Sequence, residues 1–133
     1  MQQPTTRRPK VCVLEDDPAV SDSLRISLER NGYDVTDFDG AGAFLANGRP
    51  DSYDCLIVDH RLPLLSGLEL VELLRARAYS KPALLIWAHP EAHLLPRIRR
   101  AAISETLLKP LAPDHLVAAV ERAIHCPGEG LRT

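Results

Sequence analysis

The sequence predicts an α/β domain built on a five-stranded parallel sheet with helices on both faces. Three features of the 133 residues support this fold: short apolar runs, amphipathic segments between them, and strict alternation of the two. Parallel strands are covered on both faces, so they read as continuous apolar runs rather than as alternating patterns. Strand–helix alternation repeated five times favours a doubly wound sheet with short connections.

Each expected strand is a run of four to six residues. The runs are 11–14, 33–38, 55–58, 83–87 and 106–109. VCVL at 11–14 and CLIV at 55–58 contain only apolar residues, which is typical of central strands buried on both faces. YDVTDF at 33–38 mixes polar and apolar residues, so we place this strand nearer an edge of the sheet.

Helix start and stop signals lie between these runs. The expected helices begin at Pro18, Gly40, Ser66, Pro90 and Pro113. Asp17 is a capping residue before a first-turn proline, and Gly32 is expected to end that helix. Ser66 and Glu69 have the spacing of a capping box. Asn47 and Gly48 are expected to stop the short second helix, which covers 40–46.

Composition excludes several classes of protein. The formal net charge is −2, from 16 basic and 18 acidic residues, so no basic footprint for nucleic acid or an anionic membrane is expected. No apolar stretch is long enough for a membrane span, and the first ten residues do not resemble a signal peptide. We therefore expect a cytoplasmic domain at 10–125, between flexible segments at 1–9 and 126–133.

The three cysteines, Cys12, Cys55 and Cys126, are an odd number and lack CxxC spacing. This pattern disfavours a disulfide framework or a structural zinc site. We interpret the cysteines as buried or terminal thiols.

Three of the expected strands end in charged residues: Glu15 to Asp17 after the first, Asp59 after the third, and Lys109 at the fifth. The carboxyl ends of parallel strands meet at one edge of the sheet, so these groups are expected to lie together. Clustered carboxylates repel one another unless a cation is present, and Mg²⁺ prefers such oxygen ligands. A nucleophilic carboxylate, a metal and a lysine are the groups that phosphoryl transfer needs. The alternative is an acidic loop with an unrelated surface lysine.

These stretches, VLEDD, LIVDHRLPLLSGLEL and LLKP, resemble in sequence and spacing the receiver domain of bacterial two-component response regulators. The resemblance covers residues 10–125 and is strongest to receivers of the nitrogen-fixation regulator type. It implies a sheet of strand order 2-1-3-4-5 with five helices. It also implies that an aspartate accepts a phosphoryl group from a histidine kinase.

Residue by residue, the resemblance implies that Asp59 is the phospho-acceptor. Glu15 and Asp16, with Asp59 and the backbone carbonyl of Arg61, match the Mg²⁺ site, while Asp17 keeps its role as helix cap. The resemblance further implies that Lys109 and the backbone of Ala88 contact the phosphoryl group. In relatives the bond that matches Lys109–Pro110 is often cis. The resemblance also implies that Arg61 and His89 line the entrance to the site and tune the lifetime of the phosphate.

Two positions depart from the family pattern. The fourth strand of a receiver ends in Ser or Thr, whose hydroxyl bonds the phosphoryl oxygen, but this chain has Trp87 there. The fifth strand normally carries an aromatic residue where this chain has Thr106. Because indole is only a donor, Trp87 either packs near the site or takes a special switching role. The usual conformational readout is therefore in question.

The remaining histidines and one basic run have simpler interpretations. His60, His93, His115 and His125 show no metal-ligand spacing with a partner and are interpreted as surface or helix residues. RIRR at 97–100 is interpreted as a solvated helix face, with a contact to an acidic partner as the alternative.

The first functional hypothesis is a stand-alone receiver, because no effector domain follows residue 125. It would bind a histidine kinase and a downstream or phosphotransfer protein, and act as a target regulator, a relay or a phosphate sink, with homodimerisation left open. It would be no enzyme beyond Mg²⁺-dependent self-phosphorylation and slow autodephosphorylation.

Two alternatives remain. Trp87 motivates a degenerate receiver that binds partners constitutively. The other is an aspartate-nucleophile phosphatase, but such enzymes usually carry a second aspartate where this chain has Arg61.

Overall fold

A computed structural model describes residues 7–125 of the chain and contains one sheet of five parallel strands. The strands are β1 (Lys10–Leu14), β2 (Asp34–Phe38), β3 (Cys55–Asp59), β4 (Ala83–Trp87) and β5 (Glu105–Leu108). Their spatial order is β2-β1-β3-β4-β5, and every neighbouring pair is parallel. The predicted fold class and strand order are confirmed.

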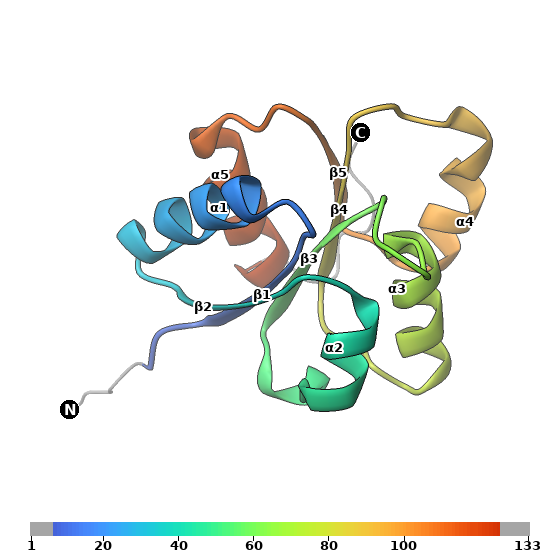
Figure 1. Ribbon diagram of the computed structural model, residues 1–133, viewed down its shortest axis with the longest axis horizontal. Helices are drawn as coiled ribbons and strands as arrows, with labels where there is room; N and C mark the ends of the chain where they lie inside the picture. Colours follow the sequence, from blue (N-terminus) through green and yellow to red (C-terminus); the bar gives the residue numbers. More distant parts are fainter. Residues whose placement is uncertain (1–6, 126–133) are drawn as a thin grey trace.

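Five α-helices cover the two faces of this sheet. They are α1 (Pro18–Arg30), α2 (Ala41–Asn47), α3 (Gly67–Ala76), α4 (Leu95–Arg100) and α5 (Pro113–His125), with 3₁₀ turns at η1 (Pro50–Ser52) and η2 (Ala92–Leu94). Figure 1 shows α1 and α5 together on one side of the sheet and α2, α3 and α4 on the other. The result is a three-layer domain.

The alternation of side chains along each strand builds a separate apolar layer on each face. Val11, Val13, Ile57 and Ile86 pack with Leu24 and Leu28 of α1 and Leu116 and Val120 of α5. Leu14, Leu56, Val58, Leu85 and Trp87 pack with α2, α3 and α4. β1, β3 and β4 are buried over nearly their whole length, whereas β2 is partly exposed at the edge, as the sequence pattern predicts.

The expected caps form. Asp17 Oδ1 accepts a hydrogen bond from the backbone N–H of Ala19 at 3.0 Å, which satisfies a free donor at the start of α1. Ser66 and Glu69 form a complete capping box at α3. Gly32 follows α1 with a φ of 93°, a conformation that favours glycine.

Most expected boundaries agree with the structure within one or two residues, and two of those that differ bear on the site. Pro90 does not open a helix: the chain passes through η2 before α4 begins at Leu95, and Pro96 occupies the first turn instead. Proline fits there because the first-turn N–H groups have no partner within the helix. β5 ends at Leu108 rather than at Lys109, although the N–H of Lys109 still donates to the carbonyl of Trp87 at 2.9 Å.

The domain bounds 10–125 and the flexibility of 1–9 and 126–133 stay predictions. Residues 1–6 and 126–133, with Cys126, lie outside the described residues. Within the described part, the carbonyl of Pro9 accepts from the N–H of Asp34, and Cys12 and Cys55 are free and buried. None of the helices described here has the length and apolar character that crossing a membrane requires.

Candidate functional site

The end of β3 places Asp59 in the centre of the sheet edge, with 3% of its surface exposed. Its Oδ1 accepts a hydrogen bond from the backbone N–H of Arg61 at 2.9 Å, so the turn after the strand holds the carboxylate. Gly67 makes this turn possible, because a Cβ there would lie 2.4 Å from the carbonyl oxygen of Asp59. The glycine eight residues after Asp59 is therefore a steric requirement.

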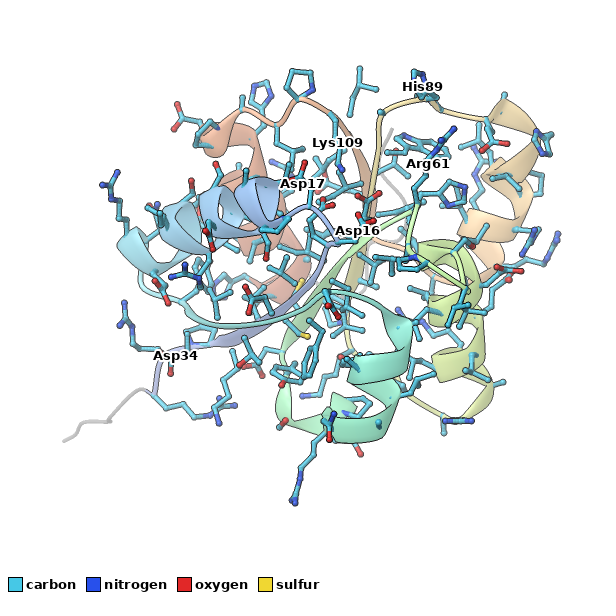
Figure 2. The ribbon with its side chains drawn as sticks, viewed as in Figure 1. Asp16, Asp17, Asp34, Arg61, His89 and Lys109 are labelled. Atoms are coloured by element: carbon cyan, nitrogen blue, oxygen red, sulfur yellow. The ribbon has the colours of Figure 1, made fainter. Side chains whose placement is uncertain are left out.

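The end of β1 brings two more carboxylates to the same place. Glu15 is 2% exposed, and its Oε2 accepts from the N–H of Asp17 at 3.2 Å. Asp16 is exposed at the rim, where Figure 2 shows it beside Asp17 and below Lys109. One carboxylate oxygen from each of Glu15, Asp16 and Asp59 lies within 4.8 Å of the others.

Lys109 enters this cluster from the end of β5. Its Nζ donates to Oδ2 of Asp59 at 2.5 Å and lies 3.0 Å from Oε1 of Glu15. The Lys109–Pro110 peptide bond is cis, as the resemblance implies. One ammonium group thus faces two buried carboxylates, and the three strands that sequence reasoning selected meet at one point.

Burial and neighbouring charges shift the pKa values of two groups in this cluster. Burial, together with the neighbouring Asp59, raises the pKa of Glu15 from its usual 4.5 to about 7. Burial lowers the pKa of Lys109, but its contacts with Asp59 and Glu15 outweigh this, so the pKa is raised overall. Lys109 therefore stays charged at neutral pH, while Glu15 is only partly ionised.

The residues present fit a divalent cation with hard oxygen ligands. Oε1 of Glu15 is buried, and the ammonium of Lys109, 3.0 Å away, also donates to Asp59. Three clustered carboxylates that share one ammonium group keep an excess of negative charge, and Mg²⁺ would balance it. The three carboxylates that the sequence singled out therefore lie together in one acidic cluster.

The two positions that depart from the family pattern, Trp87 and Thr106, lie on β4 and β5, on the opposite side of β3 from Glu15 and Asp16. Trp87 is 6% exposed and belongs to the apolar layer under α3 and α4. Thr106 is partly buried on the same face of the sheet, paired in register with Leu85. Ala88 and His89 follow on the exposed loop toward α4, where Figure 2 labels His89. The structure thus gives Trp87 a packing position.

The interpretation of His60 as a surface or helix residue was wrong. Its side chain is only 14% exposed. The rings of His60 and Trp87 pack in a T-shaped arrangement, with a centroid distance of 6.0 Å and an interplanar angle of 87°. Nε2 of His60 lies 3.4 Å from Oε2 of Glu91, a residue 31 positions away that no local spacing could indicate.

The basic run on α4 divides between two environments. Arg97 donates from Nε and Nη2 to Glu72 on α3, at 3.0 and 2.6 Å, and this contact lowers the pKa of Glu72. Arg99 and Arg100 are exposed, as the solvated-face interpretation expects. Arg97 therefore joins two helices.

Comparison with known proteins agrees with this geometry. The model of the response regulator receiver domain family matches residues 11–121. The chain belongs to this family. Receiver domains are signalling modules rather than catalytic enzymes, and they bind Mg²⁺ at an acidic pocket such as the one formed here. The family predicted from the sequence is confirmed.

Among its relatives is the transcriptional regulatory protein FixJ of Bradyrhizobium diazoefficiens, 34% identical over 90% of this chain and 58% of FixJ. The response regulator MprA of Mycobacterium sp. (strain KMS) is 34% identical over 91% of this chain and 54% of MprA. This receiver therefore spans just over half the length of these curated relatives.

Two solved structures share the fold. The response regulator StyR superposes with a TM-score of 0.83 at 36% identity, covering 92% of this chain and 62% of that one. The non-phosphorylated HemR receiver domain from Leptospira biflexa gives a TM-score of 0.81 at 26% identity, covering 88% of this chain and 94% of that one.

Proposed function

We propose that this receiver accepts a phosphoryl group on Asp59 from a histidine kinase and passes the signal on by protein–protein contact. The observation that carries this proposal is the contact of Lys109 with both Asp59 and Glu15, where the ends of β1, β3 and β5 meet at one edge of the sheet. Folding alone does not explain one partly buried lysine between two buried carboxylates at this edge. Phosphoryl transfer uses charges positioned in this way.

In the proposed reaction a carboxylate oxygen of Asp59 attacks phosphorus, the O–P bond forms, and the N–P bond to the donor imidazole breaks. The backbone N–H of Arg61 orients the carboxylate, and the ammonium of Lys109 neutralises charge on the transferred group. Glu15, Asp16 and Asp59, with the carbonyl of Arg61, would hold Mg²⁺, which supplies further charge neutralisation at the phosphoryl oxygens. The backbone of Ala88 would donate to the same oxygens, and Arg61 and His89 would govern access of water.

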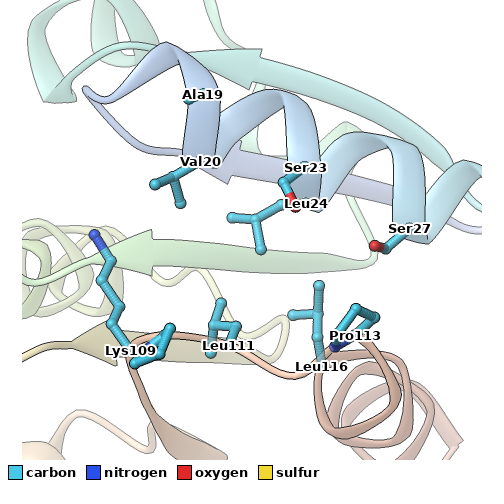
Figure 3. A pocket seen from close by; sticks show the side chains of 10 residues that line it. Ala19, Val20, Ser23, Leu24, Ser27, Lys109, Leu111, Pro113 and Leu116 are labelled. Atoms are coloured by element: carbon cyan, nitrogen blue, oxygen red, sulfur yellow. The ribbon is translucent and has the colours of Figure 1, made fainter.

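The donor domain must cover the rim around Asp59, and an apolar hollow adjoins that rim. Figure 3 shows this hollow between α1 and the segment from Lys109 to α5. Its volume is about 270 Å³. Val20, Leu24, Leu111 and Leu116 line it. We propose that an apolar side chain of the kinase packs there while its phosphohistidine faces Asp59.

The packing of Trp87 favours outputs that need little change of shape, namely a phosphorelay or a phosphate sink. The alternative, a receiver that binds its partner constitutively, rests on the same residue, because no hydroxyl stands at the end of β4. The proposed partners are a histidine kinase and a downstream or phosphotransfer protein, with homodimerisation as a further option. That this receiver works without an output domain stays a prediction.

The test is intact-mass analysis after incubation with Mg²⁺ and acetyl phosphate, with Asp59→Asn as the control. We expect the mass of one phosphoryl group to be added, and this gain to be lost in Asp59→Asn and in EDTA. Where the small donor gives no gain, a cognate kinase replaces it. Failure of both donors to label Asp59 would overturn the proposal and leave a constitutive binding module.

A further inference from the structure

The loop between β3 and α3 carries a leucine in a costly conformation. Leu64 has a φ of 71°, and the N–H of Leu65 donates to the carbonyl of Pro63 at 2.8 Å, so the three residues form a γ-turn. A γ-turn with positive φ at its central residue is the rarer and more strained form, and a bulky side chain there is an outlier. Leu64 is also 99% exposed, so packing within the receiver does not offset the strain.

The neighbours of Leu64 hold this turn whichever residue stands at its centre. Leu62 is buried, Leu65 packs against the apolar layer under α2, α3 and α4, and Gly67 lies close to the carbonyl of Asp59. Glycine or asparagine at the centre of the turn would adopt positive φ at lower cost. An exposed leucine alone is common on protein surfaces. Neither burial nor backbone conformation accounts for a leucine at this position.

The position of Leu64 indicates what covers it. Leu64 follows Asp59 by five residues, on the loop that starts at the phospho-acceptor. Asp59 is only 3% exposed, so a donor protein has to pack against the surrounding loops to bring phosphorus to the carboxylate. This loop leads to α3, which Figure 1 shows on the other side of the sheet from α1 and α5. The protruding leucine and the apolar hollow at α1 and α5 therefore flank Asp59 from the two faces of the sheet.

We propose that Leu64 is an anchor residue that inserts into an apolar pocket on the phosphodonor domain of the histidine kinase. This inference rests on the proposed function. The two proteins then meet at two apolar points, a kinase side chain in the hollow and Leu64 in a pocket of the kinase. Burial of Leu64 is gained only in this complex, so the strain of the turn stays without compensation in the free receiver.

The turn orders the anchor before the donor arrives. Pro63 has a fixed φ, and it lies beside the start of α2, where a Cβ at Gly40 would be 3.6 Å from Cγ of Pro63. The hydrogen bond from Leu65 to Pro63 then closes the turn around Leu64. An ordered anchor loses less conformational entropy on binding than a residue on a loose loop.

Two variants separate the strain from the contact. Leu64→Gly removes both the side chain and the strain, whereas Leu64→Ala removes the side chain but keeps a Cβ at positive φ. We expect the melting temperature of Leu64→Gly to lie about 2–4 °C above that of Leu64→Ala. Equal melting temperatures would contradict the strained turn.

Transfer is measured with a panel of all histidine kinases of the source organism, using the one that labels the parent protein fastest. Both variants should raise the KM for the receiver about tenfold and leave kcat unchanged, because a buried leucine contact is lost. Leu64→Met, which keeps a long apolar side chain, should restore most of the affinity. Acetyl phosphate needs no protein contact, so it should label all three variants at the parental rate.

Leu45→Ala is the matched control. It removes another exposed leucine, on α2 near Pro50 and Asp51 at the opposite edge of the sheet, and should change neither reaction. The proposal is overturned if Leu64→Ala and Leu64→Gly keep the parental KM, or if acetyl phosphate labels them as slowly as the kinase does. A parent protein that no kinase labels would refute the proposed function, and this inference with it, before any variant is compared.

Discussion

The two sides of the sheet edge differ in what holds their side chains. The acceptor side, Glu15, Asp16, Asp59 and Lys109, is a charged cluster in which one lysine faces two buried carboxylates. The readout side, Trp87, Thr106 and His60, is apolar and aromatic, with Trp87 buried under α3 and α4. The two sides adjoin, because His60 directly follows Asp59 at the end of β3 and Trp87 ends the neighbouring strand β4.

This difference indicates that the proposed chemistry and its proposed readout depend on different forces, electrostatics on one side and packing on the other. The acceptor side holds carboxylates that repel one another, and a cation would relieve this repulsion. The readout side contributes packing energy, as a core residue does. Substitutions on the acceptor side should therefore change reactivity and pH dependence, whereas those on the readout side should change stability.

The largest effect is expected for Trp87→Ala. Loss of the buried indole should lower the free energy of unfolding by about 3–5 kcal/mol, while labelling of Asp59 continues at temperatures where the variant is folded. Urea unfolding followed by circular dichroism measures the first quantity and intact mass the second. Trp87→Phe, which keeps most of the volume, is the control. A loss under about 1 kcal/mol would contradict the packing position.

Lys109→Met should separate the two sides most clearly. Removing the ammonium should slow phosphorylation of Asp59 by acetyl phosphate about a hundredfold, because one preorganised charge at the reacting group is lost. It should also tighten Mg²⁺ binding, since the two carboxylates lose their other cation. Lys81→Met, which removes a half-exposed lysine 3.9 Å from Asp54, is the matched control and should alter neither quantity. Unchanged rates in Lys109→Met would be incompatible with the proposed site.

The pKa of Glu15 makes a pH prediction for metal-free protein. Between pH 4.5 and about 7 the folded state keeps a proton on Glu15 that the unfolded state has released. Folded protein binds more protons in that window, so stability should fall as pH rises through it and stay lower above it. Urea unfolding in EDTA across this range measures the slope. Glu15→Gln should flatten it, and an identical slope in both proteins would contradict the raised pKa.

The smallest effect is expected for Thr106→Ala. Thr106 lies on edge strand β5 and is only partly buried, so its loss should cost less than about 1 kcal/mol and leave the labelling rate unchanged. Thermal unfolding and intact mass check this pair of outcomes. A slower labelling rate would mean that Thr106 contributes to the phosphorylation of Asp59.

Sequence reasoning succeeded where the signal is local. Asp17 before Pro18, Ser66 with Glu69, and Gly32 each specify a helix end through hydrogen bonds within a few residues, and the structure contains all three. It failed at Pro90, because a proline only permits a helix start, and the packing of Leu94 and Ile98 decides where α4 begins.

The sequence by itself determined the alternation of elements, the family, and the set of charged residues at the strand ends, because apolar runs and parallel strands bring those ends to one edge. Only the tertiary structure decided how these groups meet: that Lys109 reaches both Asp59 and Glu15, and that Glu15 is buried enough for its pKa to rise. Only the tertiary structure also brought His60 against Trp87 and Glu91. Such contacts join residues far apart in the chain, and side-chain packing between elements sets their distances, which no spacing along the sequence encodes.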